Sequence, residues 1–206
     1  MATDYLTEWS PQFLARCRVG SRLYGIHRTD SDHDLVQITA RPQAMPDTKP
    51  KWMAWTLDHY LECVAKGHTI MFDVLWQDPA GFLFITPEFE AVLIDRESLS
   101  NRALFRKEAR WFAQRCLCNA AGKTPEECTC ENKRGRHQLR KPIKGATQLA
   151  RLAVAAAEFL RPGPYPANFD RHFPNEAAQI CELRDRDDLD GLIAFARPWL
   201  AKWCEL

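Results

Sequence analysis

Two acidic residues near the N-terminus have the type and spacing that a metal-dependent phosphate site requires. Asp32 and Asp34 are separated by one residue and are followed by an apolar stretch. In a β-strand, side chains alternate between the two faces, so both carboxylates would project from one face. At this separation they repel each other by roughly 4 kcal/mol at an effective dielectric constant near 20. A divalent cation between them would remove this cost, and oxygen-only ligands suit Mg²⁺ or Mn²⁺.

The pair Gly20-Ser21 supplies the second half of such a site. Glycine lets the backbone approach a phosphate closely, the amide N–H groups of a turn form an anion-binding concavity, and the serine hydroxyl adds a donor. Arg22 follows directly and could hold a phosphate through two hydrogen bonds. The alternatives are a structural ion pair of Arg22, for example with Asp30, and an ordinary turn before a solvated acidic loop.

Residues 20–36, GSRLYGIHRTDSDHDLV, resemble the GS…D-x-D signature of the DNA polymerase β-type nucleotidyltransferase superfamily. They are most similar to the small predicted nucleotidyltransferases associated with phage RNA ligases. The resemblance covers most of residues 18–78 and, loosely, 136–165. It implies a polymerase-β-like catalytic palm, an NTP substrate and a third metal-binding carboxylate on a later strand. By position this carboxylate is Asp73, where the subfamily usually has glutamate. Lys144 matches a basic residue that faces the nucleotide phosphates.

Asp73 is also notable for its own surroundings. It is the only charged residue in the apolar, β-prone run 70–76, which predicts a strand. An ionised carboxylate inside a buried strand is costly unless it is paired or bound to a metal. We therefore expect Asp73 to share a metal site with Asp32 and Asp34. A salt bridge to an arginine, or a strand edge that faces water, are the alternatives.

Four cysteines form a second group with metal-binding potential. Cys116 and Cys118 precede a loop with glycine and proline, and Cys128 and Cys130 follow it. Four thiolates can hold a structural Zn²⁺ in tetrahedral geometry, and such a loop is difficult to order without one. The C-x-C spacing is tighter than the usual C-x₂-C, so loosely placed thiols or a redox-sensitive pair are alternatives.

Positive charge is concentrated in one part of the chain. The net charge is +1, but residues 102–151 hold 13 Lys/Arg and 4 Asp/Glu, against 15 and 23 in the remainder. This asymmetry predicts a surface that contacts a polyanion, and RNA is the expected partner. A solvated helix face without a ligand is the alternative.

The remaining pattern indicates the elements that position these residues. We expect a short helix over residues 10–16, a strand near 17–19, a strand over 32–40, a loop over 41–51 and a helix over 57–66. Beyond Pro87 the pattern is mostly helical, with helices expected over residues 89–94, 100–116, 144–160, 175–185 and 189–204.

These elements predict an α/β (α+β) fold, with a mixed-sheet palm followed by a helical C-terminal lobe. The expected palm is a catalytic domain over residues 1–97. The expected lobe, over residues 98–206, binds substrate and includes a cysteine-containing basic insertion at about 116–141. No stretch approaches the ~18 apolar residues that span a bilayer and no leader is evident, so a cytoplasmic location is expected, with no membrane contact.

The combined expectation is a Mg²⁺-dependent nucleotidyltransferase. It would transfer NMP from an NTP to a hydroxyl acceptor, chiefly a tRNA or another RNA end, and release pyrophosphate. Transfer to a protein or small-molecule hydroxyl fits the same motifs. So does a non-catalytic nucleotide- or RNA-binding module of the same fold. A zinc-stapled interaction protein, with 30–34 as a surface loop, is a third possibility.

Overall fold

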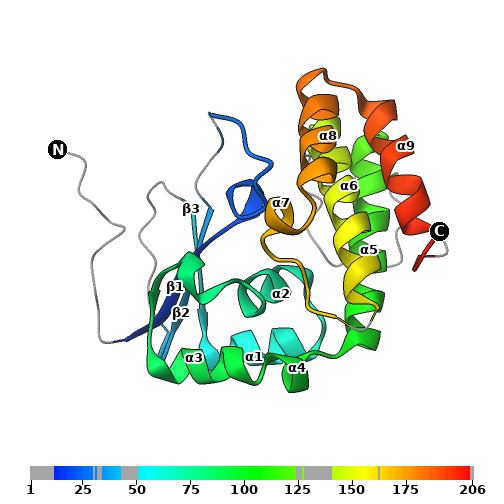
Figure 1. The fold of residues 1–206 in the computed structure, drawn as a ribbon. Coiled ribbons are helices and arrows are strands. Elements are labelled where there is room, and N and C mark those ends of the chain that lie inside the picture. Colours follow the sequence, from blue (N-terminus) through cyan, green and yellow to red (C-terminus); the bar gives the residue numbers. More distant parts are fainter. Residues whose placement is uncertain are drawn as a thin grey trace.

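A four-stranded mixed sheet forms one side of the computed structural model, and a layer of helices forms the other (Figure 1). The structure describes residues 12–29, 31, 34–42, 51–123, 127, 141–161 and 163–204. The strand order is β3-β2-β1-β4. The strands are β1 (Phe13–Val19), β2 (Asp34–Thr39), β3 (Lys51–Thr56) and β4 (Phe82–Ile85).

The two central strands are antiparallel to each other, and their register positions the N-terminal motifs. Val19, at the end of β1, pairs with Asp34, at the start of β2. The Gly-Ser turn that follows Val19 therefore lies beside the second residue of the D-x-D motif. Most of β1 and β2 is buried, and the buried Arg16 donates a hydrogen bond to Gln37 across the strands at 2.9 Å.

Helices α1 (Leu57–Ala65) and α2 (Thr69–Leu75) connect β3 to β4 through the short 3₁₀ turn at Pro79–Gly81. The side chain of Thr56 caps α1 by accepting a hydrogen bond from the backbone N–H of His59. Gly67 ends this segment with φ of +82°, and a Cβ there would meet the backbone of Leu104 at 2.5 Å. The predicted helix over residues 57–66 is therefore confirmed.

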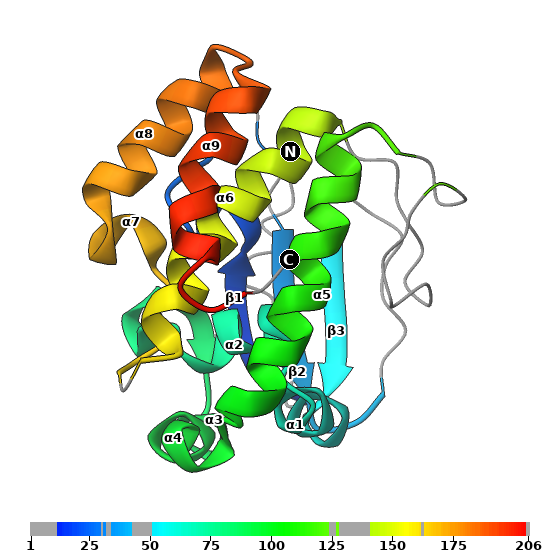
Figure 2. The same cartoon turned by 90° about the vertical axis from the view of Figure 1, so that its right-hand side faces the viewer.

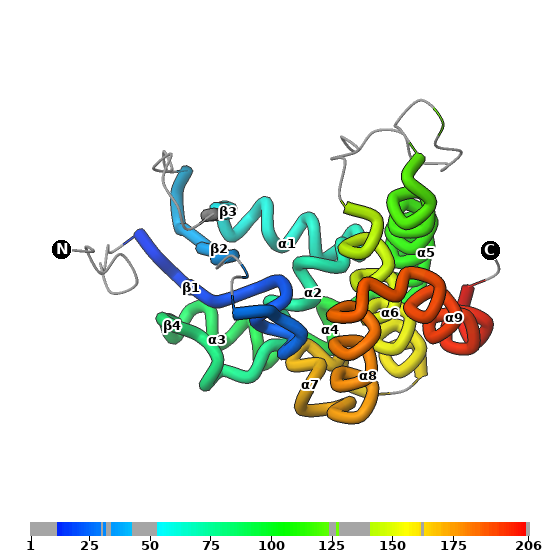
Figure 3. Tube along the Cα trace, turned by 90° about the horizontal axis from the view of Figure 1, so that it is seen from above, coloured from blue at the N-terminus to red at the C-terminus, as the bar shows by residue number. Residues whose placement is uncertain are grey.

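Helix α2 replaces the strand that the sequence predicts over residues 70–76. Five consecutive residues of α2, from Met71 to Leu75, are buried. A short element buried on all sides has no polar face, so its apolar run has neither the period of a helix nor that of a strand. Figures 1 and 3 show α2 between the sheet and the helical layer, where it contacts β1 and α5.

Helix α6 (Pro142–Phe159) lies at the centre of the helical layer. It packs between α5 (Arg102–Ala120) and α9 (Leu189–Leu200), as Figure 2 shows. A Cβ at Gly145 would lie 2.9 Å from Cβ of Asn119, so glycine permits the close approach of α5 and α6. The shorter helices are α3 (Pro87–Ile94), α4 (Arg96–Leu99), α7 (Phe169–His172) and α8 (Pro174–Asp185).

An aromatic cluster joins α2 to the helical layer. Phe72 of α2 packs against Phe105 of α5 at a centroid distance of 4.9 Å, and against Phe159 of α6 at 5.3 Å. Tyr165 lies 5.5 Å from both Phe105 and Phe159. The four rings fill the region between α2, α5 and α6 and exclude water from it.

The α+β class is confirmed, as are the strand in 32–40 and the predicted helices beyond Pro87, with shifted ends. The helix predicted over residues 10–16 is wrong where it can be compared, because β1 begins at Phe13. Two strands, β3 and β4, were not predicted. Among the described residues, no helix combines the length and apolar character required to cross a membrane. The predicted boundary between residues 97 and 98 stays a prediction.

Candidate functional site

The N-terminal motifs and the start of α6 line one cavity of about 380 Å³. We call it the Ser21–Asp34 pocket. Its lining combines the Gly-Ser turn, the start of β2, the first two turns of α6 and the end of α8. The lining residues are Ser21, Ile26, Arg28, Ser31, Asp34, Lys141, Ile143, Lys144, Thr147, Gln148 and Arg184. Three predicted site residues, Ser21, Asp34 and Lys144, therefore come together.

Gly20 allows the turn to pass directly over Asp34. The segment Gly20–Arg22 forms a 3₁₀ turn, and Gly20 has φ of +73°. A Cβ at this position would lie 2.7 Å from Oδ2 of Asp34. Glycine is therefore required both by the left-handed backbone and by the closeness of the carboxylate.

Arg22 is engaged within the N-terminal segment, and its predicted phosphate contact stays a prediction. Its guanidinium donates hydrogen bonds to the backbone oxygen of Ser31, from Nε at 3.3 Å and from Nη2 at 2.9 Å. The Ser31 hydroxyl in turn accepts a hydrogen bond from the N–H of Arg28 at 2.8 Å. Arg22 thus holds the loop that leads to the D-x-D motif, and among the described residues it does not line the pocket.

Two arginines that the sequence did not single out line the pocket instead. Arg28 donates from Nε to Oδ1 of Asp185 at 3.0 Å, and Arg184 reaches the same oxygen from Nε at 2.9 Å. Arg184 also donates to the backbone oxygen of Ile26. Partial burial raises the pKa of Asp185, but hydrogen bonds from Arg184 and Arg28 outweigh it and hold that pKa below its usual value.

The pocket carries an excess of positive charge. Lys141 and Lys144 join the two arginines, whereas Asp34 is the one acidic residue among the lining residues that the structure describes. The N-terminus of α6 adds the partial positive charge of a long helix. This arrangement favours a ligand with several negative charges, such as a polyphosphate.

Asp73 lies in the core and, among the described residues, belongs to no group that could hold a metal ion. Its side chain is 1% exposed. Oδ2 accepts a hydrogen bond from the hydroxyl of Tyr24, and Oδ1 accepts one from Tyr165 at 2.8 Å. Nη1 of Arg151 lies 3.4 Å from Oδ1, and the Arg151 guanidinium stacks 3.7 Å from the ring centroid of Tyr24.

These contacts identify Asp73 as the centre of a buried charge network. Burial raises the pKa of the Asp73 carboxyl, while Arg151 and the hydrogen bonds from both tyrosines oppose this rise. Both oxygens already have protein donors, so the geometry favours the predicted alternative, a salt bridge to an arginine, over a metal ligand. The strand placement from which the metal role was inferred is wrong.

Part of each metal site expected from the sequence lies outside the described residues. Asp32 lies outside the described residues, as do Cys128 and Cys130. Within the described ranges, no group of three or more His, Cys, Asp or Glu side chains could hold a metal ion. Cys116 and Cys118 both lie inside α5, where residues two apart point about 200° away from each other. The two side chains therefore project from nearly opposite sides of α5, and the zinc site stays a prediction.

Asp73→Asn should destabilise the protein, because the Arg151 charge loses its partner and the amide N–H₂ group faces the donors of the carboxylate oxygen that it replaces. We expect the free energy of unfolding, measured in urea, to fall by about 3 kcal/mol. Asp190→Asn, the same change at an exposed position of α9, should alter it by less than about 0.5 kcal/mol. Unchanged stability of Asp73→Asn together with lost Mg²⁺ binding would instead indicate a metal ligand.

Gly20→Ala should cost more stability than Gly122→Ala, although both glycines have positive φ. The backbone strain is about 1 kcal/mol in each case. A Cβ at Gly122 would meet no atom of the described residues within 4 Å, whereas at Gly20 it would meet Asp34. Urea unfolding of the two variants isolates this contact, and equal losses would contradict the close approach of the turn to Asp34.

Comparison with known proteins adds no relative from which a function could be transferred. A scan against family models and searches of curated proteins and of solved structures found no match to this chain. The Ser21–Asp34 pocket must therefore be interpreted from its own geometry and from the sequence motifs that line it.

Proposed function

We propose that the protein is a metal-dependent nucleotidyltransferase of the polymerase-β type, with an NTP bound in the Ser21–Asp34 pocket. The observation that carries this proposal is the convergence of Ser21, Asp34 and Lys144 on one cavity. They come from three separate segments of the chain. A volume of about 380 Å³ is within the range of small-molecule sites.

Each wall of the pocket has a role in holding the nucleotide. The backbone N–H groups of the Gly-Ser turn and the Ser21 hydroxyl donate hydrogen bonds to phosphate oxygens. Lys144 and the N-terminus of α6 offset the negative charge of the triphosphate from the opposite side. Arg28 and Arg184 add guanidinium groups, which match the geometry of phosphate oxygens.

Asp32 and Asp34 are the residues that would bind the metal. Carboxylate oxygens fit Mg²⁺, which commonly takes one or two carboxylates and completes its shell with substrate phosphates and water. When bound there, Mg²⁺ supplies charge neutralisation on the phosphate oxygens. Asp73 is not required in this set, because its oxygens are engaged by Tyr24, Tyr165 and Arg151.

The proposed reaction is transfer of NMP to a hydroxyl group. The acceptor oxygen forms a bond to the α-phosphorus, and the bond from this phosphorus to the bridging oxygen breaks. Pyrophosphate leaves with the electron pair, and the hydroxyl proton passes to water. RNA is the proposed acceptor, since 13 of the 28 lysines and arginines lie in residues 102–151.

One observation favours a second candidate function, a nucleotide-binding module without catalysis. The third carboxylate of the expected metal site is buried in another network, and β3, which pairs with β2, has no carboxylate. Titration with each NTP and Mg²⁺, combined with a pyrophosphate-release assay, separates the candidates. Binding without pyrophosphate release would favour the module.

Asp34→Asn should lower nucleotide transfer by roughly 100-fold or more, because the amide removes one metal-binding charge. The assay is incorporation from α-labelled NTPs into total RNA. Stability should change by less than about 0.5 kcal/mol, since Asp34 is only half-buried. Asp58→Asn, at an exposed position of α1, is the matched control. Full activity of a folded Asp34→Asn variant would reject the proposal.

Lys144→Gln should weaken triphosphate binding about tenfold, which corresponds to ~1.4 kcal/mol, and leave binding of the nucleoside unchanged. The reason is that the ammonium group interacts with the phosphates and not with the base. Calorimetric titration with NTP and with nucleoside measures both. Lys66→Gln, which removes an exposed lysine paired with Glu62, is the control. An equal loss for NTP and nucleoside would place Lys144 away from the phosphates.

A further inference from the structure

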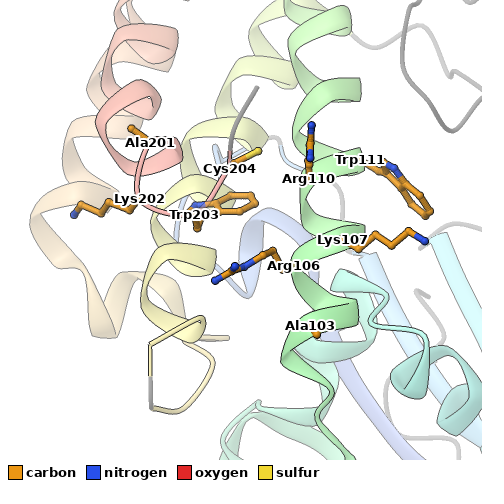
Figure 4. A pocket seen from close by; sticks show the side chains of 9 residues that line it. All are labelled: Ala103, Arg106, Lys107, Arg110, Trp111, Ala201, Lys202, Trp203 and Cys204. Carbon is orange, nitrogen blue, oxygen red and sulfur yellow. The ribbon is translucent and has the colours of Figure 1, made fainter.

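A second cavity, of about 590 Å³, lies between α5 and the turn that follows α9 (Figure 4). We call it the α5 groove. Residues from 103 to 111 of α5 form one side, and residues 201–204 form the other. Four lining residues are basic, Arg106, Lys107, Arg110 and Lys202, and among the described residues that line it none is acidic.

The charges of the α5 groove are not neutralised within the described part of the chain. Arg106 and Arg110 are exposed, lie four residues apart on one face of α5 and form no salt bridge with a described residue. Like charges at this spacing destabilise a helix. Arg102, one turn earlier, is used structurally, because its guanidinium donates to the backbone oxygens of Phe159, Arg161 and Gly163. The two arginines that follow it face outward.

Aromatic side chains accompany these cations. Trp203 is 8% exposed, and its indole N–H donates to the backbone oxygen of Ala153 at 3.0 Å, which fixes this wall of the groove. Figure 4 shows the Arg106 side chain extending from α5 toward Trp203, with Lys107 and Trp111 together on the other side of α5. The Lys107 ammonium lies 4.8 Å from the centroid of Trp111.

We propose that the α5 groove binds the phosphate backbone of single-stranded RNA, and that this RNA is the acceptor strand of the reaction proposed above, on which the inference rests. Arg106 and Arg110 would contact neighbouring phosphates, since residues four apart on a helix are separated by about 6 Å along its axis. A positively charged groove that follows the backbone is typical of sites that bind single strands without sequence preference.

The position of the groove sets the length of the strand. Arg106 and Asn119 are separated by 13 residues of α5, or about 20 Å. Asn119 lies against Gly145, which follows Lys144 of the Ser21–Asp34 pocket. With about 6 Å between neighbouring phosphates, as assigned to Arg106 and Arg110, a strand that reaches both sites needs roughly four nucleotides or more.

The test compares two double variants in binding a labelled 12-nucleotide RNA with a free 3′ hydroxyl. Arg106→Gln/Arg110→Gln should weaken binding about tenfold in 0.1 M salt, measured by fluorescence anisotropy. The slope of log K against log[salt] should fall in magnitude by about 1.4, which is 0.7 for each lost phosphate contact. Arg161→Gln/Arg186→Gln removes the same charge from exposed ion pairs and should change affinity less than about twofold.

The possible results distinguish a failure of the groove assignment from a failure of the proposed function. Unchanged affinity and salt slope in Arg106→Gln/Arg110→Gln would overturn the groove assignment, even if the protein binds NTP and transfers nucleotides. An acidic peptide of equal charge that competes as well as RNA would also overturn it. RNA binding that depends on both arginines, in a protein that binds no NTP, would support the groove as an RNA site and overturn the proposed function.

Discussion

Asp73 places a carboxylate inside the hydrophobic core, and the groups that compensate its charge connect the two walls of the Ser21–Asp34 pocket. Tyr24 follows the Gly-Ser turn by only two residues, and Arg151 lies on α6 two turns after Lys144. A buried carboxylate without donors would be strongly unfavourable, so these partners are held in place. Asp73 therefore fixes the turn and the start of α6 relative to each other.

The pocket also illustrates how a few polar contacts fix two arginines at its wall. Asp185 holds Arg28 and Arg184 together, and the carbonyl of Ile26 anchors Arg184 to the segment between the two N-terminal motifs. An incoming phosphate would compete with the Asp185 carboxylate for these guanidinium groups. Arg22 performs the complementary task from within the loop, because it holds Ser31 and so fixes the approach to β2.

Local patterns predicted those parts of the fold whose determinants are local. The apolar stretch after Asp34 indicated β2, and the apolar spacing before Gly67 indicated α1. The prediction was wrong for α2, because burial on every side removes the periodicity by which a helix is recognised. The sequence did show that the Asp73 carboxylate needs a partner. The choice between a metal and Arg151 depends on a tertiary contact, because Asp73 and Arg151 are 78 positions apart in the chain. Arg184 lies in a charged run that resembles any solvated helix face, so its place at the pocket depends on tertiary packing.

Helix α6 has a mechanical consequence for any ligand of the pocket. Six of its thirteen buried residues are alanine, which has no side-chain rotamers to rearrange, and Gly145 allows close contact with α5. Helix α6 is therefore expected to be rigid, because α5 and α9 pack against it. Adaptation to ligands of different size must then come from the opposite wall, where one arginine and one serine hydroxyl maintain a short loop.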